Sequence, residues 1–117
     1  YEDGARGPHK YDCWGLVREI RHEVLGMTLL PSFGHVRHTM PLEFTKACQS
    51  VAQTMTVCEP EHGSIAAVFR GKICTHVALV VNHNGKLSVI EINPKINCKL
   101  SDLSDFQRKY PKAVYHK

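Results

Sequence analysis

Hydrophobic residues in the first half of the chain recur at helical spacing. After a Gly/Pro-rich stretch at 1–11, Asp12 stands where a helix N-cap belongs, and Gly26 stands where that helix would end. The apolar residues between them lie mostly three or four positions apart: Cys13, Leu16, Val17, Ile20 and Val24. A second helix is expected to begin at Pro41, with an apolar side made of Phe44, Ala47, Cys48, Val51, Ala52 and Met55.

The second half of the chain carries short apolar runs that are typical of strands. Strands are predicted at 64–69, 75–81 and 86–92, and "NHNG" between the last two is a strong hairpin signal. A short helix beginning at Ser101 and an edge strand at 113–115 are expected to follow. Helices followed by an antiparallel meander predict an α+β fold, with the N-terminal helices packed on a small sheet.

Length and composition are ordinary for a globular protein. The chain has 117 residues, of which 43% are apolar and 22% charged, so a single domain spanning 1–117 is expected. The apolar runs are too short to span a membrane, and the net charge of +4 comes from scattered basic residues, which does not indicate a nucleic-acid surface. Because the first residue is not Met, we expect the chain to continue a longer one, with its true N-terminus and any signal peptide hidden.

One of the five cysteines holds a position that favours reactivity. The set is odd and has no CxxC pair, so a complete disulfide framework is excluded and reduced cysteines are expected: Cys13, Cys48, Cys58, Cys74 and Cys98. Cys13 is the first residue of the first predicted helix, where unpaired N–H groups and the helix dipole lower a thiol pKa. The alternative, a small hydrophobic residue buried on the inner face of the helix, has equal weight from position alone.

A nucleophilic cysteine needs a base, and His76 is the best candidate. It opens an apolar strand, where an imidazole without a partner is costly. The other histidines fall in predicted loops, turns, tails or exposed helix positions: His9, His22, His35, His38, His62, His83 and His116.

Glu91, on the next predicted strand, is expected to orient His76. A hairpin loop at 82–85, or the tighter 83–84, places the two residues directly opposite each other. A two-residue turn at Asn84–Gly85 places them diagonally on the same face. A three-residue loop would place them on opposite faces.

Three motifs resemble the NlpC-type papain-like cell-wall peptidases. "YEDGARGPHKYDCWGLV" is similar to the opening pattern of that family, "EHGSIAAVF" to its turn and buried strand, and "THVALVVNHNGKLSVIEINP" to its His-Val-Gly strand and hairpin. The resemblance implies a nucleophile at Cys13, a base at His76 and a third polar group at Glu91, where His is commonest. It also implies residues for substrate or oxyanion contact at Tyr1, Asp12 and Trp14.

The resemblance implies a papain-like fold and hydrolysis of amide bonds in peptidoglycan stem peptides, after D-γ-glutamyl and before diaminopimelate or lysine. No cofactor and no metal are implied. Trp14 stands where many members carry Ser, and together with "GARGP" it is similar to the branch found in phage tail assembly proteins. Other tail proteins are then expected partners, with synthesis in the host cytoplasm and action at the cell wall from the virion tail. A cellular enzyme would instead be exported to the cell envelope.

Three rival interpretations remain open. A metal site is the first, because Cys74 and His76 alternate on one strand and would share a face, with His83 and Cys98 as further ligands. The second is a papain-like amidase or acyltransferase with another substrate. The third is a non-catalytic module that binds the cell wall or serves as a structural part of a tail tip.

Overall fold

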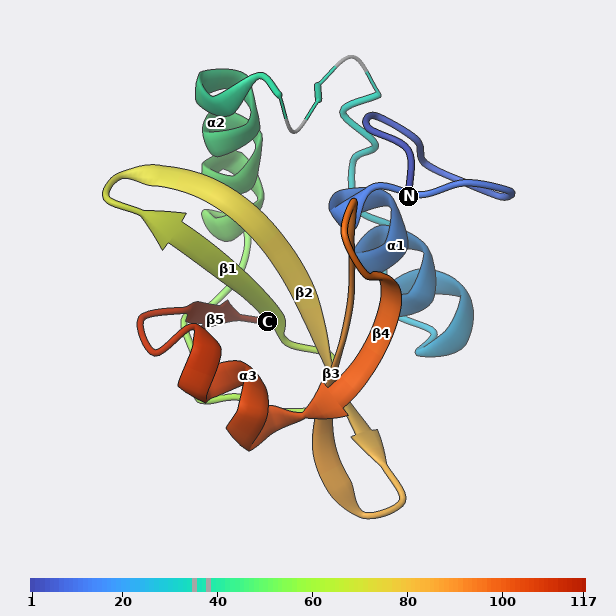
Figure 1. The fold of residues 1–117 in the computed structure, drawn as a ribbon, viewed down its shortest axis with the longest axis vertical. Coiled ribbons are helices and arrows are strands. Elements are labelled where there is room, and N and C mark those ends of the chain that lie inside the picture. Colours follow the sequence, from blue (N-terminus) through green and yellow to red (C-terminus); the bar gives the residue numbers. More distant parts are fainter. Residues whose placement is uncertain (35, 38) are drawn as a thin grey trace.

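Helices occupy the first half of the chain, and strands with one short helix occupy the second half. The computed structural model describes residues 1–34, 36–37 and 39–117 (Figure 1). In chain order, its elements are α1 (Cys13–Glu19), the π-helical turn η1 (Ile20–Val24), α2 (Pro41–Ala52), β1 (Ile65–Arg70), β2 (Ile73–His83), β3 (Lys86–Asn93), β4 (Asn97–Asp102), α3 (Leu103–Lys109) and β5 (Val114–His116). The predicted helix starts at Cys13 and Pro41 are therefore confirmed.

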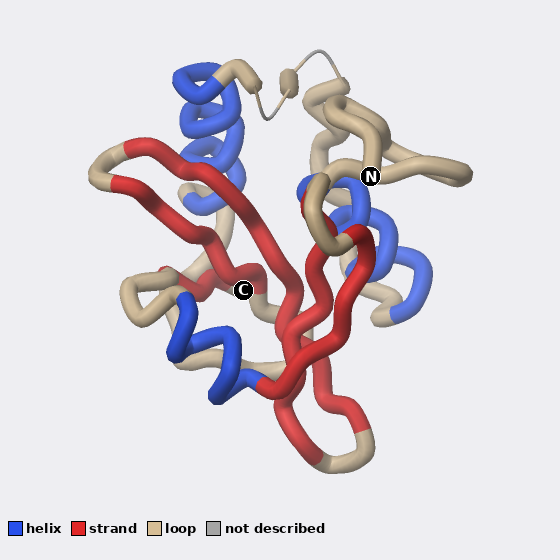
Figure 2. Tube along the Cα trace, viewed as in Figure 1, coloured by secondary structure: helices blue, strands red, loops and turns tan. Residues whose placement is uncertain are grey.

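The five strands form one antiparallel sheet in the order β4-β3-β2-β1-β5, with helices on both faces (Figure 2). Alternate residues of β1 and β2 face opposite sides, as strand geometry requires. One set packs with α1 and α2, and its sheet residues include Ile65, Ala67, Val77 and Leu79. The other set packs with α3 and β5, and its sheet residues include Ala66, Val68, Ala78 and Val80. The predicted α+β arrangement is confirmed.

The hairpin between β2 and β3 closes with a two-residue turn at Asn84–Gly85. His83 pairs with Lys86, and both turn residues have positive φ, 53° and 79°. Asn-Gly suits such a turn because both of its residues tolerate the left-handed region. Of the two even-length registers expected, the structure adopts the second, and a three-residue loop is excluded.

A β-bulge interrupts the pairing of β1 with β2. Val68 pairs with His76 and the next residue, Phe69, pairs with Cys74, so Thr75 is an extra residue. The bulge reverses the alternation of side chains, and Cys74 therefore packs in the same core cluster as Val77. The prediction that Cys74 and His76 share a face of the strand is wrong for this reason.

The first helix departs from its predicted apolar face at η1. Leu25 N donates to Ile20 O at 3.0 Å, a five-residue step that shifts the phase of the helix. Val24, expected on the apolar side, is 72% exposed. Arg21 is buried in place of Val24 and donates from Nε to Gly63 O at 3.1 Å.

The C-terminal part contains one strand that the sequence does not predict. β4 is largely exposed and has no apolar alternation, so it lacks the usual sequence signal for a strand. Ser101 belongs to this strand, and α3 begins two residues later than expected. β5 lies close to the predicted edge strand.

His35 and His38, which we expected in a loop, lie outside the described residues. In the part of the chain that the structure describes, no helix has the length and apolarity needed to span a membrane.

Candidate active site

Cys13 and His76 line one open cleft, although 63 positions separate them along the chain. The cleft has a volume of about 450 Å³. α1 contributes Cys13 and β2 contributes His76, while its other walls include Tyr1, Thr75, Asn93 and Tyr110. The fold therefore brings the candidate nucleophile and base to one surface that is open to a substrate.

His76 and Glu91 form a buried hydrogen-bonded pair at the wall of this cleft. His76 Nε2 lies 2.9 Å from Glu91 Oε1, and the two side chains are 11% and 3% exposed. This contact confirms the pairing expected from the hairpin register. Because Glu91 binds Nε2, the other ring nitrogen is the one that can exchange a proton with a group in the cleft. The ring of Tyr110 packs beside the imidazole, with centroids 6.3 Å apart.

The carboxyl of Glu91 is held in its ionised form by His76. Burial, the largest single effect, raises the pKa of Glu91, while the hydrogen bond and charge of His76 lower it. Lys109 and Lys99 lower the pKa further, and the net shift is downward. A carboxylate in this position keeps the imidazole oriented and stabilises the imidazolium that forms when it accepts a proton.

We expect Glu91→Gln to lower the free energy of unfolding at pH 7 by about 1–3 kcal/mol, because it removes a charge-assisted hydrogen bond. Since the pKa of Glu91 is depressed in the folded state, its contribution is complete above the unfolded-state pKa of about 4.3 and is lost as the pH falls through the lower folded value. Urea unfolding of both proteins at pH 7, 5 and 3 measures the difference.

The exposed Glu59→Gln serves as the control for that series and should change stability by no more than about 0.5 kcal/mol. If Glu91→Gln lowered the free energy of unfolding as much at pH 3 as at pH 7, the loss of stability would come from the changed shape of the side chain and not from its charge.

The Cys13 thiol is almost completely buried, with 2% exposure. Burial raises its pKa to about 12, even though the backbone N–H groups of Val77 and Trp14 act in the opposite direction. The expectation that the helix N-terminus leaves the thiol with a lowered pKa is therefore wrong, because desolvation is the larger effect. Val77 follows His76 directly in β2, so the backbone contact of the thiol is made next to the residue that carries the imidazole in the chain. Nucleophilic attack by this sulfur requires a base that takes its proton during the reaction.

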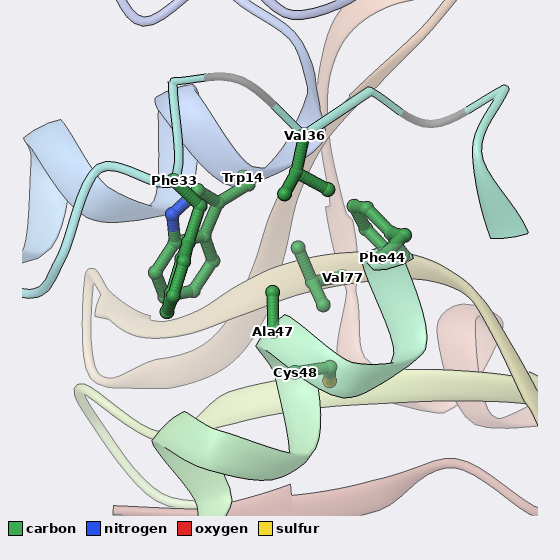
Figure 3. Close-up of a pocket in the computed structure, with 7 residues that line it drawn as sticks. All are labelled: Trp14, Phe33, Val36, Phe44, Ala47, Cys48 and Val77. Atoms are coloured by element: carbon green, nitrogen blue, oxygen red, sulfur yellow. The ribbon is translucent and has the colours of Figure 1, made fainter. Parts of the chain in front are cut away.

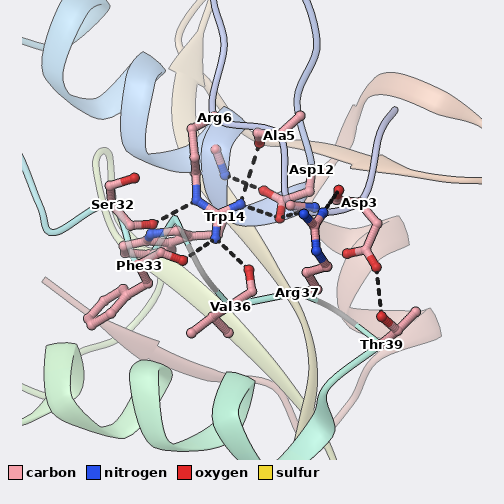
Figure 4. A network of polar contacts seen from close by, with 12 residues as sticks. Asp3, Ala5, Arg6, Asp12, Trp14, Ser32, Phe33, Val36, Arg37 and Thr39 are labelled. Carbon is pink, nitrogen blue, oxygen red and sulfur yellow. Dashed lines mark hydrogen bonds and ion pairs between the residues drawn. The ribbon is translucent and has the colours of Figure 1, made fainter.

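Asp12 fixes the first turn of α1 as its N-cap. Its carboxylate is 0% exposed, and Oδ1 accepts a hydrogen bond from Gly15 N at 2.7 Å, as predicted for an N-cap. Oδ2 accepts from Gly4 N at 3.2 Å and from Arg6 Nη1 (Figure 4). These contacts give Asp12 a structural role, and Asp12 is not among the residues that line the cleft.

Arg6 connects three segments of the N-terminal half. Besides Asp12, its guanidinium donates to the carbonyl oxygens of Ser32 at 2.7 Å, Phe33 at 2.9 Å and Val36 at 2.9 Å (Figure 4). The planar fork of arginine suits this set of acceptors. Sequence reasoning missed this residue because "GARGP" was interpreted only as a loop and a family marker.

Tyr1 and Trp14, both expected to contact substrate, lie in different places. Tyr1 lines the cleft with Cys13, and burial together with the nearby thiol raises the pKa of its phenol, which stays protonated and able to donate. The Trp14 indole is buried and donates from Nε1 to Pro31 O at 3.0 Å. It points into a separate apolar pocket with Phe33, between α1 and α2 (Figure 3). Only the backbone N–H of Trp14 reaches the Cys13 sulfur.

The four residues of the rival metal site are not brought together. Cys74 Sγ lies 3.4 Å from Cys48 Sγ in the core, whereas His83 is exposed near the tip of the hairpin and Cys98 is exposed in β4. Among residues 1–34, 36–37 and 39–117, no group of three or more His, Cys, Asp or Glu is placed to hold a metal ion.

No protein-family model matches the chain, and no curated protein and no solved structure matches it either. Functional assignment therefore depends on the contacts in the cleft and on the motifs of the sequence.

Proposed function

We propose that the chain is a cysteine-dependent amide hydrolase with a papain-like site, in which Cys13 is the nucleophile, His76 the general base and Glu91 the orienting group. The observation that carries this proposal is the buried His76–Glu91 pair at the wall of a cleft that Cys13 also lines. An imidazole–carboxylate pair that shares a cleft with a thiol supplies the three groups that nucleophilic catalysis by cysteine needs.

In the proposed reaction, His76 accepts the proton of Cys13 as the sulfur attacks the carbonyl carbon of the substrate amide. The tetrahedral oxyanion is stabilised by the backbone N–H of Cys13 at the start of α1 and by the protonated phenol of Tyr1. His76 then returns the proton to the departing amine, which leaves a thioester on Cys13. Water, activated by His76, hydrolyses the thioester and releases the free thiol and a carboxylic acid.

Peptidoglycan stem peptides are the proposed substrate class, and the bond is the amide after D-γ-glutamyl. This choice is supported by the three sequence motifs similar to NlpC-type peptidases. Trp14 and the "GARGP" stretch support placement in a phage or prophage tail, with other tail proteins as partners. A papain-like amidase or acyltransferase would use the same three residues on another acyl group.

Digestion of purified peptidoglycan tests the proposal, with fragments identified by mass spectrometry. Wild type is expected to release fragments ending in γ-D-glutamate, and Cys13→Ala is expected to release none above background. Cys98→Ala is the matched control, because Cys98 is exposed in β4 and should leave cleavage unchanged. Cleavage by Cys13→Ala at the wild-type rate would disprove the assignment of the nucleophile.

A non-catalytic wall-binding or tail-tip module is the second candidate, and the burial of the Cys13 thiol favours it. It predicts that wild type and Cys13→Ala sediment equally with peptidoglycan while neither cuts it.

A further inference from the structure

Two lysines at the rim of the cleft carry positive charge that no acidic side chain in its lining offsets. Lys95 lies in the turn between β3 and β4, and Lys109 is the last residue of α3. Among the described residues that line the cleft there is no Asp or Glu. The nearby carboxylate of Glu91 is already bound to His76.

Lys109 lies close to the candidate catalytic pair. Its Nζ is 5.3 Å from the centroid of the Tyr110 ring, and that ring packs beside His76 with centroids 6.3 Å apart. The charge of Lys109 also contributes to the lowered pKa of Glu91. A group bound to this ammonium would therefore lie in the same cleft as Cys13 and His76.

Lys95 lies in a turn whose backbone is held by hydrogen bonds to the side chain of Asn93. Asn93 Oδ1 accepts hydrogen bonds from the backbone N–H of Lys95 at 2.8 Å and of Ile96 at 3.0 Å. Asn93 itself lines the cleft, so this turn forms part of the cleft wall. Lys95 and Lys109 thus reach the cleft from two different elements.

We propose that Lys95 and Lys109 form a carboxylate-binding subsite, which selects substrates that carry a free carboxylate next to the scissile amide. This inference rests on the proposed amide hydrolase function. Cations at the rim of a concave site attract anionic ligands, and their hydrogen bonds to a carboxylate are charge-assisted. A D-glutamyl residue linked through its γ-carboxyl presents such a group, its free α-carboxylate. Conversion of this group to a carboxamide removes the charge while keeping the shape.

Binding of two probes to the Cys13→Ala variant tests the subsite without interference from cleavage. The probes are a stem tetrapeptide with the free D-glutamyl α-carboxylate and the same peptide with a carboxamide there. We expect the carboxylate peptide to bind about three- to ten-fold more tightly at low salt, the size expected for one or two partly exposed charge pairs. The preference should shrink at about 0.5 M salt, where such pairs are screened.

Substitution of both cleft lysines, Lys95→Gln and Lys109→Gln, should abolish the preference for the carboxylate peptide. The matched control replaces two exposed lysines outside the cleft lining, Lys46→Gln and Lys72→Gln, and should retain it. Three results would overturn the subsite. The two peptides could bind with equal affinity, the preference for the carboxylate peptide could survive in the Lys95/Lys109 double variant, or neither peptide could bind measurably.

Cleavage by the wild-type protein separates this inference from the proposed function. A binding preference without cleavage of either peptide would retain the subsite and disprove the hydrolase. Cleavage of both peptides at equal rates, together with equal affinities, would retain the hydrolase and disprove the subsite.

Discussion

Replacing Gly15 by alanine is expected to destabilise the protein by about 2–4 kcal/mol, the sum of an overpacking cost and a lost backbone hydrogen bond. A Cβ at this position would lie 2.4 Å from Ala5 O and 3.0 Å from the Cα of Arg6. Both neighbours are backbone atoms, so the 1–12 loop has to move. Ala5 O also accepts from Asp12 N at 2.9 Å, and this bond is lost with the movement.

The sign of this effect is unusual, since alanine in place of glycine within a helix ordinarily stabilises by about 0.5–1 kcal/mol. Urea unfolding measures the change. The control is Gly34→Ala, where the nearest atom to the added Cβ is Ser32 Oγ at 3.5 Å, and a change within about 0.5 kcal/mol is expected. A stabilised Gly15→Ala protein would show that the loop does not pack against α1 in this way.

Arg6→Met is expected to cost about 3–5 kcal/mol, because it leaves the Asp12 carboxylate buried without its charge partner. The Asp12 side chain is 0% exposed and that of Arg6 only 11%. Methionine retains much of the volume but donates none of the hydrogen bonds to Ser32, Phe33 and Val36. Because Asp12 caps α1, the start of the helix and the position of Cys13 should be disturbed together, and the proposed amide cleavage should fall with stability.

A double-mutant cycle separates charge pairing from the other losses. Asp12→Asn keeps an acceptor for Gly15 N but removes the charge, so the double variant with Arg6→Met should cost less than the sum of the two single changes. Arg70→Met removes an exposed arginine and should change stability by no more than about 0.5 kcal/mol. Strict additivity of the two single changes would show that the ion pair is not the reason for the loss.

Local sequence signals predicted the elements that carry the candidate site. Asp12 before an apolar helical repeat located the start of α1, and Asn84–Gly85 between two apolar runs located the hairpin. The even length of that turn was enough to place His76 and Glu91 within reach of each other. These features depend on residues close together in the chain, where helix capping and turn chemistry act.

Features set by tertiary contacts were not predictable from the same signals. The bulge at Thr75 depends on how β1 pairs with β2, and it decides which face Cys74 occupies. The burial of Cys13, which reverses the expected direction of its pKa shift, depends on packing against β2. β4 is held by pairing with β3, since its own residues are mostly exposed.

The bonds of Arg6 bear on the order in which the site assembles during synthesis. They join residues within the first 36 positions, whereas the His76–Glu91 pair lies within the later hairpin, so each half of the site is held by contacts within its own part of the chain. An N-terminal segment leaves the ribosome first, so the contacts of Arg6 have all their partners before β2 and β3 are synthesised. The thiol can therefore be positioned long before the imidazole exists as a folded neighbour. The proposed catalytic pair is completed only when α1 docks on β2, so the proposed hydrolase would be inactive as a nascent chain until its C-terminal half has folded.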